Sequence, residues 1–380
     1  MPECSNPLWP CAMTGAAACL AGFEGMSVVI HGSSGCYYYP ATLLHAPLHG
    51  TFILEHEVIF GSEERLVEVV SGLSGKGRKI AVITTCVPAI LGEDIRSMLE
   101  NYDVILVDSP GFAGDVETGY RKALAALPCR VDTDLPGVNI DGVSLSDPYA
   151  AGNIQELQRL LRLASVPVAT VFCQDRFERL SASAAYTVGT NSDFASGIGE
   201  YCGGTLGPEA VRATFGRLGD LFEDADVLPV LAEADVQEER IIRACDKYLQ
   251  RFDPPSVVIA AGYAYALFAA RMLEQYLDAD IRCICSRNPP GECRYPAEHV
   301  TGMGQIRDLI ASHDPDLVIG SSFERAVSPG RAFAGMTPPL RGEIRLAPRP
   351  LAGINGSLSF VEQVLNAVLD TRHDPGPLQV

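Results

Sequence analysis

The chain has 380 residues, of which 47% are hydrophobic, and it carries a formal net charge of -18. This length is enough for two or three domains with hydrophobic cores, and the composition excludes a disordered chain. The acidic charge argues against a nucleic-acid partner or an anionic membrane surface, because attraction to phosphate needs clustered Lys and Arg.

Targeting signals and cysteine usage indicate a compartment. The sequence has no run of about 18 apolar residues that would span a membrane, and its N-terminus lacks the basic start and apolar run of a secretory signal. We therefore expect a cytoplasmic protein. Thiols stay reduced there, so the twelve cysteines are interpreted as buried apolar residues plus a few metal ligands.

Short β-branched runs, each followed by a Gly, Ser or Pro turn and a helical stretch, recur along the chain. This pattern is typical of an α/β fold, and near-continuous apolar runs indicate parallel strands covered on both faces. The first series of predicted strands comprises residues 27–31 (SVVIH), 79–84 (KIAVIT) and 103–107 (DVILV). These strands define a first domain over residues 1–135.

Two further series follow the same pattern. The second domain, residues 136–255, has predicted strands at 137–140 and 167–172 and a helix at 154–164. For the third domain, residues 256–380, we predict strands at 256–260, 281–285, 316–319 and 343–346 and helices at 262–277 and 359–369. Residues 370–380 are expected to be loose. The sequence thus predicts three Rossmann-like domains with parallel sheets.

Three cysteines stand where chemistry is expected. Cys36 ends the turn HGSSGC, Cys86 ends the turn TTC after the next strand, and Cys11 precedes a helix of small residues. Ligands of parallel sheets collect at the carboxyl ends of strands, and Gly32 and Gly35 let the backbone approach a bound group. Position alone leaves two interpretations, iron–sulfur ligands or inert buried thiols.

Other motifs are less informative. The spacing of Cys283, Cys285 and Cys293 favours two core thiols and one loop thiol over a metal site. The sequence has neither GxxxxGK[ST] nor GxGxxG after a strand, so this chain is expected to bind no nucleotide. Four histidines lack the HExxH arrangement and are interpreted as lining a cavity or the surface: His31, His45, His49 and His56.

Several segments together carry a family resemblance. They are PLWPCAMTGAAACLAGFEGMSVVIHGSSGCYYYP, EHEVIFGSEE, IAVITTCVPAILGEDI and VDSPGFAGDVETGY, followed by VNIDG, PDLVIGSSFERAV and RLAPRPLAGINGSLSFVEQVLNAVLD. In this order they resemble the nitrogenase component 1 superfamily over nearly the whole chain. The β chain of the molybdenum–iron protein is most similar, and the superfamily also includes cofactor-assembly scaffolds and tetrapyrrole reductases.

The resemblance implies a role for the three cysteines. Cys11, Cys36 and Cys86 match the family's ligands of the P-cluster, or of its simpler [4Fe-4S] counterpart, at a subunit interface. A serine that adds a ligand in the nitrogenase β chain is replaced here by Gly111, beside Ser109. This departure favours [4Fe-4S] over a full P-cluster. The residues expected to line the cluster are Gly32, Ser34, Gly35, Tyr37 and Thr85.

The ligands of the nitrogenase active-site cofactor have no counterpart here. The segment AAYTVGTNSDF has no cysteine at the comparable place, and PLAGINGSL has no histidine. A bound iron–molybdenum cofactor is therefore not expected in this chain.

The resemblance also implies partners. An ATP-hydrolysing iron protein of the nitrogenase reductase kind would deliver low-potential electrons to the cluster, and a substrate or second cofactor in the cleft between domains would receive them. A tetrapyrrole reductase and a metallocofactor maturation scaffold both remain open. Three thiolates do not complete a cluster, which implies a homodimer or a heterodimer with an α-like paralogue. A non-catalytic metal-chelate binding protein is the alternative from another class.

Overall fold

The computed structural model describes residues 9–372, which form two compact units. The first unit contains the described residues up to Asp147 together with Val168–Thr187 and Phe194–Tyr201. The second contains Pro148–Pro167, Val188–Asp193 and the described residues from Cys202 onward. Each of the three predicted domain ranges holds one sheet of four or five strands. The division into three domains stays a prediction.

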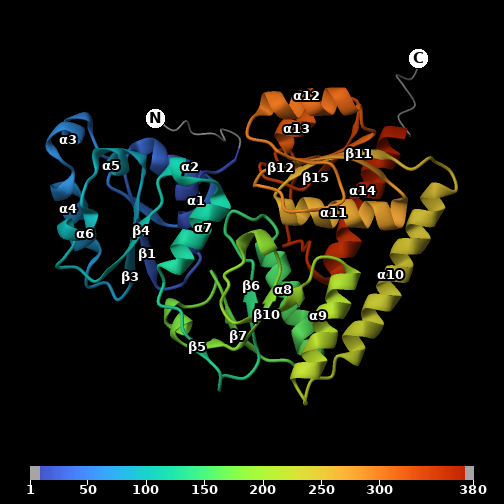
Figure 1. Cartoon of the computed structure of the whole chain (residues 1–380), viewed down its shortest axis with the longest axis horizontal. Coiled ribbons are helices and arrows are strands. Elements are labelled where there is room, and N and C mark those ends of the chain that lie inside the picture. Colours follow the sequence, from blue (N-terminus) through green and yellow to red (C-terminus); the bar gives the residue numbers. More distant parts are fainter. Residues whose placement is uncertain (1–8, 373–380) are drawn as a thin grey trace. The chain divides into compact units, whose positions relative to one another are not determined.

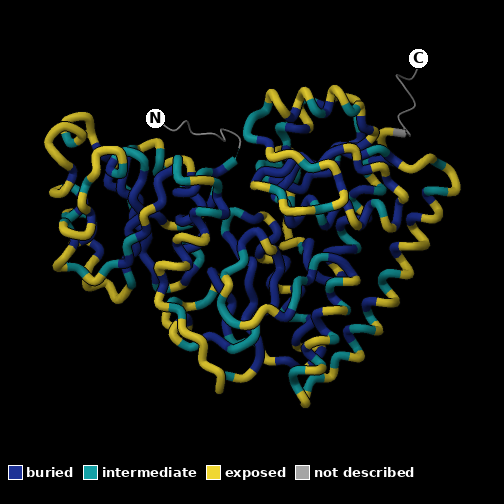
Figure 2. The backbone as a smooth tube through the Cα atoms, in the orientation of Figure 1, coloured by how far each residue is buried: buried dark blue, intermediate teal, exposed yellow. Residues whose placement is uncertain are grey.

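The first sheet has the strand order β2-β1-β3-β4, and all of its strands are parallel (Figure 1). Its strands are β1 (Met26–His31), β2 (Leu48–Gly50), β3 (Lys79–Thr84) and β4 (Val104–Asp108). β1 is buried along its whole length, as its apolar run predicts (Figure 2). His31 pairs with Thr84 and Thr84 with Asp108, so the carboxyl ends of three strands lie in one row.

Several helical segments of the first unit lie before residue 126. They are α1 (Ala12–Leu20), α2 (Ser34–Leu44), α3 (Glu55–Phe60), α4 (Glu63–Leu73), α5 (Cys86–Leu91), α6 (Ile95–Met98), η1 (Gly111–Ala113) and α7 (Val116–Ala125). The sequence of α4 explains why it forms a helix against the sheet. Leu66, Val70 and Leu73 recur at helical spacing and pack on Val29 and Val82 of the sheet.

The second sheet has the order β10-β9-β6-β7. It consists of β6 (Val138–Asp141), β7 (Val168–Val171), β9 (Tyr186–Gly189) and β10 (Glu200–Gly204), and the small strands β5 (Val131–Asp132) and β8 (Ser183–Ala184) pair separately. The associated helices are α8 (Ala150–Leu163), η2 (Phe177–Ser181), η3 (Ser192–Phe194), α9 (Pro208–Leu221) and α10 (Leu228–Leu249).

The third sheet has the order β13-β12-β11-β14-β15 and is parallel throughout. Its strands are β11 (Ser256–Ala261), β12 (Asp280–Ser286), β13 (Ala297–His299), β14 (Leu317–Gly320) and β15 (Ala332–Gly335). Its helices are α11 (Tyr263–Leu277), α12 (Met303–His313), α13 (Ser322–Val327) and α14 (Gly353–Arg372). The predicted α/β class is confirmed.

Two sequence predictions are wrong. Residues 343–346 form no strand, because Ile344 and Leu346 are 86% and 97% exposed and bury nothing. The fifth strand is β15, whose small residues fit beside β14. Residues 370–372, expected to be loose, belong to α14, and the rest of that prediction lies outside the described residues. Within residues 9–372, no helix is long and apolar enough to cross a membrane.

Candidate metal centre in the first unit

The row of strand ends in the first sheet places three turns side by side. Gly32, Thr85 and Ser109 each follow directly after the last residue of β1, β3 and β4. A Cβ at Gly32 would lie 1.9 Å from Thr85 Oγ1, so only glycine fits there. The Thr85 amide donates to the His31 carbonyl at 3.1 Å. Gly32 and Thr85, both expected to line a cluster, are therefore in contact, and their role at a cluster stays a prediction.

Cys36 lies in the first turn of α2, half-buried, and the hydroxyl of Ser33 donates to its Sγ at 3.7 Å. Burial raises the pKa of the Cys36 thiol, and negative charge on Cys86 and Cys11 raises this pKa further. The Ser33 and Thr85 hydroxyls act in the opposite direction and lower the same pKa. Cys86 and Cys11 thus lie close enough to Cys36 to affect its pKa.

Cys11 and Cys86 flank Gly111. The Gly111 amide donates to Cys86 Sγ at 3.1 Å, and a Cβ at Gly111 would lie 3.2 Å from the sulfur of each cysteine. Such contacts are tighter than ordinary van der Waals contacts, so any side chain at this position would press on both thiols. A glycine at position 111 therefore suits the local packing.

The position of Cys11 depends on a close approach of α1 and α7. A Cβ at Gly15 would lie 1.8 Å from the Val116 carbonyl oxygen, and a Cβ at Gly119 would lie 1.6 Å from that of Ala12. The Ala12 amide also donates to the Gly114 carbonyl at 3.1 Å. The small residues of TGAAACLAG thus let the two helices touch through their backbones, and Cys11 caps the end of this seam.

The donor set suits a cluster better than a single ion. Within the described part of the chain, no three His, Cys, Asp or Glu side chains converge on one metal position. A cluster bound at separate irons instead needs thiolates spread over several turns, and Cys11, Cys36 and Cys86 are half-buried thiols on three turns. The glycine between two of them leaves room where a side chain would stand. These residues fit an iron–sulfur cluster, and their ligand role remains a prediction.

The other predicted lining residues lie on α2. Ser34 and Gly35 are exposed, and a Cβ at Gly35 would come no closer than 4.0 Å to another group, the Ser33 hydroxyl. The Tyr37 hydroxyl donates to the Leu48 carbonyl at 3.2 Å, while its ring stacks edge-on against Phe52. Their role at a cluster stays a prediction.

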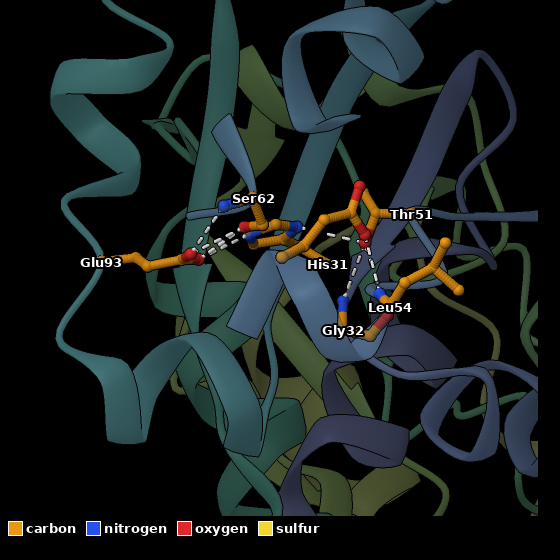
Figure 3. A network of polar contacts seen from close by, with 7 residues as sticks. His31, Gly32, Thr51, Leu54, Ser62 and Glu93 are labelled. Carbon is orange, nitrogen blue, oxygen red and sulfur yellow. Dashed lines mark hydrogen bonds and ion pairs between the residues drawn. The ribbon is translucent and has the colours of Figure 1, made fainter. Parts of the chain in front are cut away.

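Sequence reasoning missed a polar network behind these turns, which Figure 3 shows. His31, interpreted as a cavity or surface residue, is completely buried and bonded to Thr51, Ser62 and Glu93. The surface interpretation is therefore wrong for His31. The missed signal is a histidine within an otherwise apolar strand. Such a histidine is buried with the strand and must then have polar partners. Thr14, 3.8 Å from Cys11 Sγ, was also missed.

The second cysteine group does not form a comparable site. Cys283 and Cys285 are buried on β12 with their sulfurs 4.0 Å apart, while Cys293 Sγ lies 3.4 Å from the Tyr295 carbonyl oxygen. This arrangement agrees with core strand thiols and a separate loop thiol.

An exposed apolar surface lies on α3 and α5, two helices that contact each other. Phe60 and Ile59 are 84% and 75% exposed, and α5, which begins at Cys86, contributes a further exposed pair. We call Ile59, Phe60, Ile90 and Leu91 the α3–α5 apolar surface. Large exposed apolar groups of this kind mark interaction sites.

Comparisons with known proteins identify the family of the chain. Residues 11–369 match the family described as nitrogenase component 1 type oxidoreductase. The nitrogenase molybdenum–iron protein β chain of Frankia alni is 31% identical over 189 residues, which cover 42% of this chain and 36% of that relative. The chain thus spans little more than a third of that relative's length.

Two other matches cover nearly the whole chain. The nitrogenase iron–molybdenum cofactor biosynthesis protein NifE of Clostridium pasteurianum is 22% identical over 93% of this chain and 86% of its own length. The solved structure titled nitrogenase Cp1 at pH 6.5 superposes with a TM-score of 0.82 at 16% identity, covering 98% of this chain and 94% of that one, which shows a common fold. Because the family match extends from the first candidate ligand into the last helix, the chain belongs to the nitrogenase component 1 type oxidoreductases.

Proposed function

We propose that the chain is a subunit of a cytoplasmic oxidoreductase that accepts low-potential electrons through an iron–sulfur cluster ligated by Cys11, Cys36 and Cys86. The observation that carries this proposal is that Cys11 and Cys86 flank Gly111 while both act electrostatically on Cys36. The donor set and the absence of a serine at position 111 favour [4Fe-4S] over a P-cluster.

When bound, the cluster supplies one-electron storage at low potential. The chain's own residues hold and tune it. The Gly111 amide donates to Cys86 Sγ and the Ser33 hydroxyl donates to Cys36 Sγ, and hydrogen bonds of this kind stabilise negative charge on sulfur. Ser34, Gly35 and Tyr37 would line the exposed side of the site.

The α3–α5 apolar surface supports docking of a partner beside the cluster, because one of its helices begins at a cluster ligand. We propose an ATP-hydrolysing, nitrogenase reductase-like iron protein as this partner, so the nucleotide is bound there and not by this chain. A second copy or an α-like paralogue would complete the cluster's ligands.

Metal analysis of anaerobically purified protein tests the proposal. We expect iron, acid-labile sulfide and visible absorbance in the wild-type protein, and we expect Cys36→Ala to lose all three. Cys129→Ala is the matched control, because Cys129 is also a half-buried thiol but lies on another segment. A colourless, iron-free protein that stays so after anaerobic reconstitution would refute the proposal.

A maturation scaffold is the second candidate function, favoured by the match to a cofactor biosynthesis protein over 93% of the chain. The two functions differ in what happens to the metal. In the presence of the reductase and ATP, an electron-transfer subunit should be reduced and reoxidised repeatedly with its iron content unchanged. A scaffold should instead lose iron and sulfide to an acceptor apoprotein.

The identity of the final electron acceptor or ligand distinguishes a tetrapyrrole reductase from a metal-chelate binding protein. A tetrapyrrole substrate would be reduced in an assay that contains the iron protein and ATP. Its fluorescence would be quenched when it binds. A metal-chelate binding protein would keep its ligand affinity after Cys36→Ala. The redox proposal instead expects this variant to lose its cluster.

A further inference from the structure

His31 is completely buried, yet both nitrogens of its imidazole have polar partners (Figure 3). Nδ1 lies 3.1 Å from Thr51 Oγ1, and Nε2 lies 3.2 Å from Glu93 Oε2 and 3.1 Å from Ser62 Oγ. These partners come from three separate segments. The network therefore joins the turn that leads to Cys36 with the segment that follows α5, the helix that begins at Cys86.

The hydrogen-bond donors and acceptors around the neutral His31 ring determine its tautomer. Ser62 donates its amide and its hydroxyl to Glu93, at 3.1 and 2.7 Å, and the carboxylate accepts both. Nε2 must then carry the hydrogen that points at Glu93. Nδ1 is left as an acceptor, and the Thr51 hydroxyl is the donor that can satisfy it.

The same network can also accommodate a second proton. A protonated Nδ1 would donate to Thr51 Oγ1, which releases the threonine hydrogen. The Thr51 hydroxyl lies 3.4 Å from the Gly32 carbonyl oxygen, which already accepts from the Ile53 amide and has a second lone pair. Glu93 would face the new positive charge. Either protonation state thus leaves every polar atom of His31 and Thr51 with a partner.

We propose that His31 is the proton acceptor coupled to reduction of this site, and that Thr51 reports its protonation to the turn carrying Cys36. This inference rests on the proposed function. A bound cluster would take up one electron from a low-potential donor and so add negative charge beside the cysteines, and one proton from the solvent would add to His31 Nδ1. The Thr51 hydrogen turns from Nδ1 to the Gly32 carbonyl, and reoxidation reverses each change.

The electrostatics around His31 allow such a change. Burial lowers the pKa of His31, which keeps the ring neutral before reduction. Glu93 and Glu57 act in the opposite direction, and Glu57 is itself paired with Arg65 at 2.6 Å. The Gly32 turn that follows His31 packs directly on Thr85, the neighbour of Cys86, and negative charge added near this turn would raise the pKa of His31.

A redox titration of the anaerobically purified protein against pH tests the coupling. Between the pKa of His31 in the oxidised protein and its higher pKa in the reduced protein, uptake of one proton per electron changes the reduction equilibrium tenfold per pH unit, which is about 59 mV for a one-electron step. We expect this slope in the wild type and in His56→Gln, a control at an exposed histidine. We expect His31→Gln to be independent of pH.

Two further variants guard against a folding defect. Thr51→Val keeps the shape of the side chain but removes the acceptor of the Nδ1 proton, and Glu93→Gln removes the facing charge. In both variants, the pH range over which the reduction potential depends on pH should move to lower pH, while the visible absorbance is retained. A loaded wild-type protein with a pH-independent potential would overturn this inference and leave the proposed function intact. A protein that binds no cluster would overturn both.

In the metal-free protein, nitrogen-15 NMR provides a readout without the cluster. His31 should appear as the Nε2-protonated tautomer at neutral pH, and Thr51→Val should lower its pKa. An Nδ1-protonated ring would contradict the assigned network and overturn the inference.

Discussion

The seam between α1 and α7 offers a sharp test of how Cys11 is held. In Gly119→Ala, the new methyl carbon would lie 1.6 Å from the Ala12 carbonyl oxygen, on the residue next to Cys11. Neither atom belongs to a flexible side chain. The helices must therefore move apart, or α7 must shift along α1, before the variant can fold.

The size of the effect follows from the distance. To reach an ordinary contact of 3.4 Å, the two backbones must separate by roughly 1.8 Å, and gaps of about 1 Å already forfeit up to half of the dispersion energy between facing atoms. Overpacking of this kind costs about 1–3 kcal/mol, and we expect the upper end because the obstacle is backbone. Alanine's better helix propensity returns only about 1 kcal/mol.

Thermal unfolding followed by circular dichroism measures this cost. A loss of about 3 kcal/mol should lower the melting temperature of the first unit by roughly 6–12 °C. Gly72→Ala is the control, because Gly72 lies in α4 with open space around its Cβ and should be neutral or slightly stabilised. Gly15→Ala added to Gly119→Ala should cost little more, since the seam is already open. Equal stability of Gly119→Ala and Gly72→Ala would refute the close approach.

Three further outcomes are expected. Gly111→Ala should lower the iron content of anaerobically purified protein with little change in melting temperature, because its methyl group presses on two thiols at 3.2 Å; unchanged iron would contradict the site. Arg287→Met should destabilise the protein by about 3–5 kcal/mol in urea unfolding, because it strips the completely buried Glu324 of its ion-pair partner; a change below about 1 kcal/mol would contradict this. The lowered native pKa of His31 means that the unfolded chain binds more protons below pH 6.5, so stability should fall as pH drops from 6.5 through the native pKa, and His31→Gln should flatten this dependence.

The strands could be predicted because burial on both faces leaves a direct trace in the sequence. The run 79–84 is β3 to the residue, and SVVIH is β1 with one residue added. Residues 343–346 misled the prediction, since their alternation of charged and apolar residues is typical of a half-buried strand. Whether a neighbouring strand is present to bury Ile344 and Leu346 is a tertiary fact that no local pattern contains.

The sequence by itself determined the α/β class and singled out Cys11, Cys36 and Cys86, because turn glycines and strand ends mark where ligands collect in parallel sheets. Only the tertiary structure decided that Gly111 stands between two of the thiols and that His31 reaches Glu93, 62 residues away. These contacts join segments that are distant in sequence, and their distances depend on how closely helices and turns pack. Side-chain packing at that range leaves no periodic signal in a single sequence.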